Sequence, residues 1–282
     1  MNRLSAAKRA QVVAALVEGN SVRSTVRMTG VAKNTITKLL VELGAACSSF
    51  LDHALVNLPC KRVQCDEIWS YVAAKEKNVT PEMAGAKFCG DAWTWIALDA
   101  DSKLICSWLV GKRDPECAQE FIKDLAGRLA HRVQLTTDGL RLYLTAIADN
   151  FGSEIDYAML VKIYGNDPEA EKRYSPAVCT ACKKENKIGD PNPKDISTSY
   201  VERQNLTMRM HMRRFTRLTN AFSKKLENHT ASVAIHVMYY NFCRIHQTLR
   251  VAPAMAAGLT GTLWSVYDLV TLLEASTAEQ AA

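Results

Sequence analysis

Three acidic residues far apart in the sequence are of the type that metal-dependent phosphate chemistry needs. Asp66 lies within a run of β-forming residues (62–72), Asp138 directly follows another such run (133–137), and Glu202 opens a long helical pattern. Carboxylates that share a buried cleft repel one another unless a divalent cation neutralises them, and ligand sets made only of oxygen select Mg²⁺ or Mn²⁺. We therefore expect a metal site if the fold brings the three together.

The helical pattern around Glu202 also offers ligands for phosphate. At about 100° per residue, Arg209 and Arg213 lie within about 20° of Glu202 on the helix, and Asn205 lies one turn on. Because Arg binds phosphate through a planar fork, this face can hold a metal beside a phosphodiester. The alternative is a capping box of Ser199 and Glu202, in which Glu202 only returns a hydrogen bond to the backbone. The spacing alone leaves both open.

The elements that must position these residues follow an α/β order. Strand patterns cover residues 62–72, 92–98, 103–110, 133–137 and 157–164, and helical patterns cover 115–130, 140–148, 198–218, 226–242 and 265–274. Three antiparallel strands followed by alternating helices and strands bring the first strand beside the fourth, so that Asp66 and Asp138 become neighbours. The prediction is a mixed five-stranded sheet with flanking helices, in which the Pro- and Gly-rich residues 165–196 form a loop or insertion.

Residues 1–50 are expected to form a separate all-α domain, followed by a linker at 51–60. Helical patterns at 5–18, 22–29 and 34–43, with Gly30 in the turn before the last, are typical of a helix-turn-helix. The first turn of the last helix, which Asn34 is expected to cap, would enter the major groove. The candidate DNA contacts are Lys33, Asn34, Thr35, Thr37 and Lys38. The alternative is a plain three-helix bundle, although the basic entry to the helix favours DNA.

The positive charge is concentrated in two separate parts of the chain. The net charge is +6, yet residues 1–50 hold seven basic and two acidic side chains, and residues 197–250 hold nine and two. Clustered Lys and Arg favour a polyanion partner because neutralised phosphates release counterions, although a solvated helix face has the same composition. The second group of candidate DNA contacts consists of Arg203, Arg213, Arg214, Arg217, Lys224 and Lys225.

Four motifs in order give the sequence a family resemblance. They are CDEIW at 65–69, TDG at 137–139, YVERQNL at 200–206 and YNFCRIH at 240–246. Together they resemble the transposases of small bacterial insertion sequences, over roughly residues 60–255.

The resemblance implies an RNase-H-like catalytic domain at 61–250 and a C-terminal tail at 251–282. It implies that Asp66, Asp138 and Glu202 form the catalytic, metal-binding DDE triad, with supporting roles for Asn205, Arg209 and His246. Relatives often begin with a Cys-rich, zinc-ribbon-like segment, whereas residues 1–46 contain no Cys. DNA binding would then rest on the helix-turn-helix alone.

The expected function is that of a DNA transposase, which cleaves transposon ends and transfers the strands into target DNA. Two Mg²⁺ ions, for which Mn²⁺ can substitute, would serve the reaction. One chain offers one triad and one helix-turn-helix for two ends, so we expect at least a homodimer on DNA. The expected location is the bacterial cytoplasm, at the nucleoid, since the apolar runs at 12–17 and 263–273 are short or interrupted. The alternatives are a non-catalytic DNA-binding regulator with a decayed core, and a structure-selective nuclease or resolvase of the same fold.

Other residues of chemical interest are given structural roles at this point. Glu67 and Asp99 are rivals for the triad, but Asp99 is expected in a turn with a structural role, and Glu67 is expected on the opposite face of the strand from Asp66. Cys179 and Cys182 form a single CxxC without a second nearby pair, which favours reduced surface thiols over half of a zinc knuckle. His236 lies in an apolar run and is expected in the core.

Overall fold

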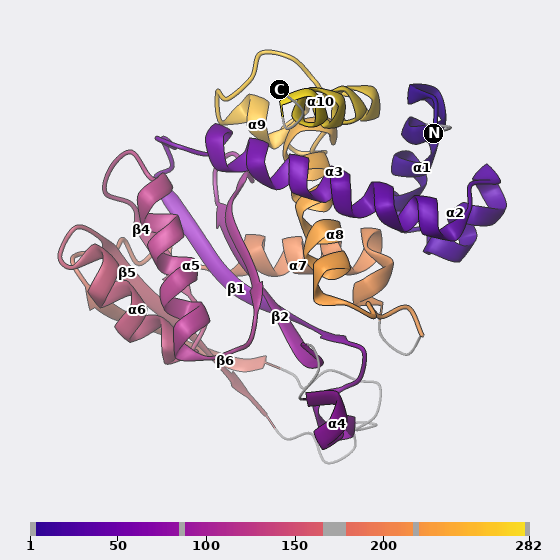
Figure 1. Ribbon diagram of the computed structural model, residues 1–282. Helices are drawn as coiled ribbons and strands as arrows, with labels where there is room; N and C mark the ends of the chain where they lie inside the picture. Colours follow the sequence, from indigo (N-terminus) through magenta and orange to yellow (C-terminus); the bar gives the residue numbers. More distant parts are fainter. Residues whose placement is uncertain (1–3, 85–87, 166–178, 217–219, 280–282) are drawn as a thin grey trace.

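A six-stranded mixed sheet forms the centre of the protein, for which a computed structural model describes residues 4–84, 88–165, 179–216 and 220–279 (Figure 1). The strand order is β3-β2-β1-β4-β5-β6. The strands are β1 (Arg62–Val72), β2 (Gly90–Asp99), β3 (Ile105–Gly111), β4 (Gln134–Thr137), β5 (Asp156–Tyr164) and β6 (Cys179–Ile188). Strands β1 to β3 are antiparallel, β4 and β5 run parallel to β1, and β6 returns antiparallel to β5. This is the expected RNase-H-like α/β arrangement.

The sixth strand corrects the expected count of five. It lies within residues 165–196, which the sequence predicts as a loop or insertion. The strand is polar and almost entirely exposed, with the sequence CTACKKENKI, and therefore shows no alternation of apolar and polar residues. Its backbone pairing with β5 defines it instead.

Helices flank both faces of the sheet. The longer ones are α1 (Ala6–Val17), α2 (Val22–Thr29), α3 (Lys33–Ala54), α5 (Pro115–Arg128), α6 (Leu142–Phe151), α7 (Ser199–His211), α8 (Leu226–Met238) and α10 (Val266–Glu279). Short helical segments are α4 (Pro81–Ala84), α9 (Pro253–Ala256), the 3-10 turns Glu76–Asn78 and Arg213–Phe215, and the π turn Tyr239–Cys243. Trp95 of β2 packs against Phe121 of α5 and Tyr143 of α6, which places these two helices on one face. Helix α7 lies on the other face, over β1 and β2.

The helix α3 is longer than its pattern predicts. It runs without a break for 22 residues, past the expected end at residue 43, and it begins at Lys33 with Ala32 rather than Asn34 at the N-cap position. Its apolar stripe continues through Leu43, Cys47 and Leu51, all of which are buried.

The N-terminal helices join the same continuous hydrophobic core as the sheet. Helix α3 packs along α8, and α1 packs against α10, as Figure 1 shows. At Gly44 the backbones of α3 and α8 approach so closely that an added Cβ would lie 2.5 Å from the Cα of Ala231. In the described residues, no helix is both long and apolar enough to cross a membrane.

Candidate active site

The pairing of β1 with β4 brings Asp66 and Asp138 together. The two parallel strands pair from Arg62 with Gln134 up to Cys65 with Thr137, so the next residue of β1 is Asp66 and the residue that follows β4 is Asp138. One potential ligand atom from each of Asp66, Asp138 and Glu67 lies within 4.8 Å of the others. The described part of the chain thus holds a three-carboxylate cluster at the end of β4.

The position of Glu67 corrects the expectation that it points away from the site. Strand alternation does hold, since Asp66 contacts α7 while Glu67 packs near Tyr143 on the other face. However, β4 ends at Thr137, so no strand separates the two faces of the sheet beside Asp138. The carboxylates of Asp66, from one face, and of Glu67, from the other, therefore both reach Asp138. The Glu67 side chain is 1% exposed.

Glu67 is buried between the guanidinium of Arg113 and the hydroxyl of Tyr143. Its Oε2 lies 3.0 Å from Nη2 of Arg113, while its buried Oε1 has no hydrogen-bond partner. The sequence offers Glu67 only as a rival for the triad, through the adjacent Asp-Glu pair of the motif, and the structure places it within the carboxylate cluster.

The cluster is electrostatically strained without a cation. Burial first, and then the charge of Asp138, raise the pKa of Asp66 to about 7, and hydrogen bonds from the backbone N–H of Glu67 and from Asn205 oppose the rise. Burial and the charge of Asp138 likewise raise the pKa of Glu67 to about 7. A divalent cation would reverse this repulsion, and the all-carboxylate donor set, with an unpartnered Glu67 oxygen, fits Mg²⁺ or Mn²⁺.

Helix α7 is fixed to β1 by side chains of the strand. The Oε1 of Gln64 accepts hydrogen bonds from the backbone N–H groups of Tyr200 and Val201, at 2.9 and 3.1 Å, and satisfies donors of the first turn. One turn further, Nδ2 of Asn205 donates to Oδ2 of Asp66 at 2.8 Å. The supporting position expected for Asn205 is therefore next to the cluster. Gln64 carried no signal in the sequence.

Glu202 lies at the border of the cluster rather than within it. Its Oε1 accepts a hydrogen bond from Oγ1 of Thr198 at 2.5 Å and forms an ion pair with Lys162 of β5. Its charge contributes to the raised pKa of Asp66. Lys162 was not predicted, because only the β5 register places it opposite α7.

The capping-box interpretation of Glu202 is wrong. Helix α7 begins at Ser199 after Thr198, and no side chain caps it. The backbone N–H of Ser199 donates to Ser197 instead of the Glu202 carboxylate. Glu202 therefore makes tertiary contacts only, apart from the Thr198 hydroxyl.

The expected row of arginines on one helix is only half present. Helix α7 ends at His211, and Arg213 belongs to a separate 3-10 turn, so it does not share a helix face with Glu202. Met212 takes an extended conformation between the two segments. Arg209 does lie on α7 and is half-buried.

The remaining predicted residues lie in three places. His246 follows the π turn beside Lys103 and Arg244, and burial and these charges lower its pKa. In the first turns of α3, Lys33, Asn34, Thr35 and Lys38 are exposed and Thr37 is half-buried. Arg203, Arg213, Lys224 and Lys225 are exposed, and Arg214 is half-buried. Arg217 lies outside the described residues.

The thiols of Cys179 and Cys182 lie close together at the exposed β6 strand. Their sulfurs are 3.7 Å apart, and the register shift beside Tyr164 puts both on one side of the strand. No third His, Cys or carboxylate joins them in the part of the chain that the structure covers. His236 is buried, as expected for a core histidine.

Comparisons with known proteins find similarity of structure only. No protein-family model and no curated protein matches the sequence. The piggyBac transposase in its synaptic complex with hairpin DNA is 9% identical, with 96% of this chain and 70% of that chain covered and a TM-score of 0.44. The Mos1 transposase paired-end complex with the left transposon end is 12% identical, with 55% and 60% covered and a TM-score of 0.23. The Mos1 strand transfer complex is 11% identical, with 83% and 78% covered and a TM-score of 0.25.

Proposed function

We propose that the protein is a DDE-type DNA transposase, which cleaves transposon ends and joins them to target DNA with the help of divalent metal ions. The observation that carries the proposal is the cluster in which Asp66, within β1, lies beside Asp138, which directly follows the neighbouring parallel strand β4, with a raised pKa at Asp66. Such a cluster is unfavourable for stability and fits a metal site. The location would be the bacterial cytoplasm, at the nucleoid.

The residues have distinct roles in this proposal. Asp66 and Asp138 would hold Mg²⁺, or Mn²⁺ in its place, and Asn205 would orient Asp66 through its hydrogen bond. Bound metal would activate a water molecule, or the 3′-hydroxyl of the cleaved DNA strand, as the nucleophile and would stabilise the charge that develops on the phosphate. Glu202, which pairs with Lys162 in the structure, would be the third residue to hold the metal, and Lys162 would pair with the DNA phosphate.

Glu67 is the competing third ligand, since it already lies within the cluster. The two can be separated by isosteric variants. Glu202→Gln should abolish metal-dependent cleavage and joining. Glu67→Gln should retain both, because its main partner is Arg113. The opposite pattern would assign the role to Glu67.

The test of the proposal is a reaction with three DNA components. The protein is incubated with labelled DNA from either side of its own reading frame, a target plasmid and Mg²⁺, with EDTA as the control. We expect nicked ends and joined products that require the metal and disappear in Asp138→Asn. Cleavage of branched DNA without joining would identify a nuclease or resolvase. DNA binding without any metal-dependent cleavage would identify a regulator.

We further propose that the active form on DNA is at least a homodimer, because two ends must be processed together. Mixing Asp138→Asn chains with chains that carry Lys33→Ala and Asn34→Ala tests this. Restored joining in the mixture would indicate that one subunit binds an end while another cleaves it. A monomeric complex that completes joining would refute the assembly.

A further inference from the structure

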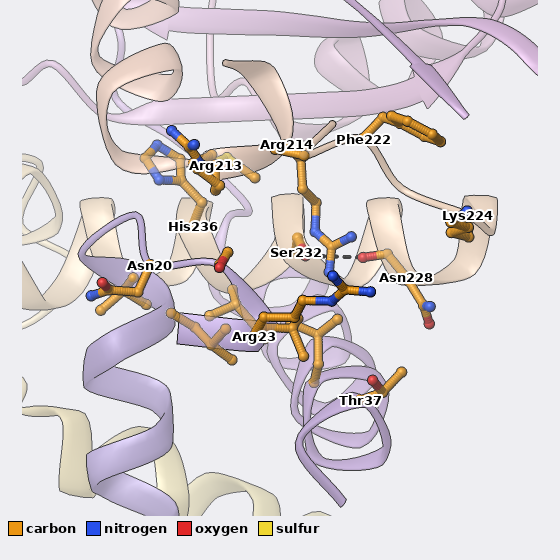
Figure 2. A pocket seen from close by; sticks show the side chains of 18 of the residues that line it. Asn20, Arg23, Thr37, Arg213, Arg214, Phe222, Lys224, Asn228, Ser232 and His236 are labelled. Atoms are coloured by element: carbon orange, nitrogen blue, oxygen red, sulfur yellow. Dashed lines mark hydrogen bonds between the residues drawn. The ribbon is translucent and has the colours of Figure 1, made fainter. Parts of the chain in front are cut away.

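A cavity lies where the N-terminal helices meet the segment around α8, apart from the carboxylate cluster (Figure 2). Its volume is about 740 Å³, within the range of cavities that hold ligands. One wall comes from the α1–α2 turn and the starts of α2 and α3, and the other comes from residues 211–214, 220–224 and α8. We call it the seam cavity.

The charged side chains that line the seam cavity are all basic. They are Arg23, Lys33, Arg213, Arg214 and Lys224, and none of them forms an ion pair with a carboxylate among the described residues. Figure 2 shows Arg23 and Arg214 extending into the same space from opposite walls. Convergent charges of one sign repel, so this arrangement favours an anion between them.

A chain of hydrogen bonds holds Arg214 without neutralising it. Nη1 of Arg214 donates to Oγ of Ser223 at 2.8 Å, and the Ser223 hydroxyl lies 3.2 Å from Nδ1 of His229. Nε2 of His229 lies 3.1 Å from Oγ of Ser70, which donates to the carbonyl oxygen of Ala92. Because the Ser70 hydroxyl donates to Ala92, it can only accept from Nε2 of His229, and Nδ1 of His229 then accepts from Ser223. Each group thus donates to the next, from the guanidinium of Arg214 to the carbonyl of Ala92.

Every group in this chain after Arg214 is neutral. Burial and the charge of Arg214 lower the pKa of His229 to about 3, and burial lowers the pKa of Arg214 to about 10. A half-buried guanidinium without a counterion favours a ligand that supplies the negative charge.

His236 adds an unsatisfied donor to the same wall. It is 3% exposed, and its Nδ1 has no hydrogen-bond partner. Its Nε2 lies 3.5 Å from the amide nitrogen of Gln204, which can only donate, so the ring proton belongs on Nδ1.

We propose that the seam cavity binds the phosphodiester backbone of DNA, with Arg214 as a fixed anchor and Arg23 and Lys224 closing from the two walls. The proposal rests on the proposed function in taking DNA as the source of the phosphate. Cations spread over two walls of a cavity this large suit a run of backbone better than one free phosphate ion. The bound phosphates would bridge the N-terminal helices and the catalytic core.

DNA binding in EDTA tests the proposal without any cleavage. Fluorescence anisotropy of a random-sequence duplex, measured across salt concentrations, gives the slope of log K against log salt. Arg23→Gln and Lys224→Gln should each make this slope shallower by about 0.9, one phosphate contact each, and should do so on element-end DNA as well. Lys123→Gln, on the exposed side of α5, removes the same charge and should leave the slope unchanged.

Inorganic pyrophosphate distinguishes the source of the phosphate. We expect it to raise the melting temperature of the wild type and to compete with DNA, and both effects should weaken in Arg23→Gln. If pyrophosphate binds in the cavity but Arg23→Gln and Lys224→Gln have the same salt slope for DNA binding as the wild type, the cavity binds a small phosphate. That result would overturn the proposal. Unchanged slopes without pyrophosphate binding would overturn it too. The reaction of the wild type with Mg²⁺ reports separately on the proposed function.

Discussion

Replacing Asp138 with Asn should stabilise the metal-free protein. Among the charged neighbours, Asp138 contributes most to the raised pKa of both Asp66 and Glu67. Asn keeps the shape of the side chain and the oxygen that accepts the hydrogen bond from the backbone N–H of Leu140, 2.9 Å away. The substitution therefore removes repulsion with little loss of local structure.

The size of the effect follows from the raised pKa values. A rise of the Asp66 pKa from 3.8 to about 7 corresponds to about 4 kcal/mol at pH 8. Burial causes the larger part, so we assign about 1 kcal/mol to Asp138, and a similar amount acts on Glu67. Asp138→Asn should then raise the free energy of unfolding by about 2 kcal/mol at pH 8.

The pH dependence has a defined sign. Because folding raises these pKa values, the folded state binds protons more tightly than the unfolded state. The contribution to stability is therefore complete below about pH 4 and is lost as the pH rises to about 7. The wild type in EDTA should lose stability between pH 4 and 7, and Asp138→Asn should lose less.

Urea denaturation in EDTA at pH 5 and pH 8 measures both effects. Asp190→Asn, at an exposed position, serves as the control and should change stability by less than about 0.5 kcal/mol. Addition of Mg²⁺ should stabilise the wild type and leave Asp138→Asn unaffected. If Asp138→Asn were less stable than the wild type in EDTA at pH 8, the electrostatic reasoning would be refuted.

Three further substitutions test the packing and the border of the site. Gly44→Ala should lower the free energy of unfolding by at least about 2 kcal/mol, because the new Cβ would meet the Ala231 backbone. The control is Gly127→Ala in α5, where no atom lies within 4 Å of the added Cβ, and it should raise the free energy of unfolding by up to about 1 kcal/mol. Urea denaturation measures both variants. Similar effects of Gly44→Ala and Gly127→Ala would contradict the close approach of α3 and α8. Glu202→Gln should change stability by less than about 1 kcal/mol, since its ion pair with Lys162 is partly exposed, and should abolish cleavage in the DNA reaction. Retained cleavage would remove Glu202 from the site.

The meeting of Asp66 and Asp138 could be predicted because it depends on strand order alone. Once the first and fourth strands are parallel neighbours in register, the middle of the first strand must lie beside the end of the fourth. The contact of Glu67 with the cluster could not be predicted in this way. Alternation separates the side chains of Asp66 and Glu67 only where the sheet continues on both sides, and β4 ends beside Glu67. The ion pair of Glu202 with Lys162 depends on how β5 faces α7, which no local pattern encodes.

Helix ends were predicted less well where apolar spacing continues beyond the helix. Met208 and Met212 are four residues apart and both buried, as in a helix, yet α7 ends at His211. The opposite error occurs in α3, whose apolar stripe continues because α8 covers it. In both cases tertiary packing, which a single segment does not reveal, decides where the helix ends.

Anomalous diffraction from crystals grown with Mn²⁺ and a short DNA duplex would test the central claim most directly. The account predicts a manganese peak between the carboxylates of Asp66 and Asp138, with Glu202 turned from Lys162 toward the metal, and no peak there in Asp138→Asn. Wild-type crystals without a peak at this position, but with DNA bound, would contradict metal-dependent chemistry at the cluster.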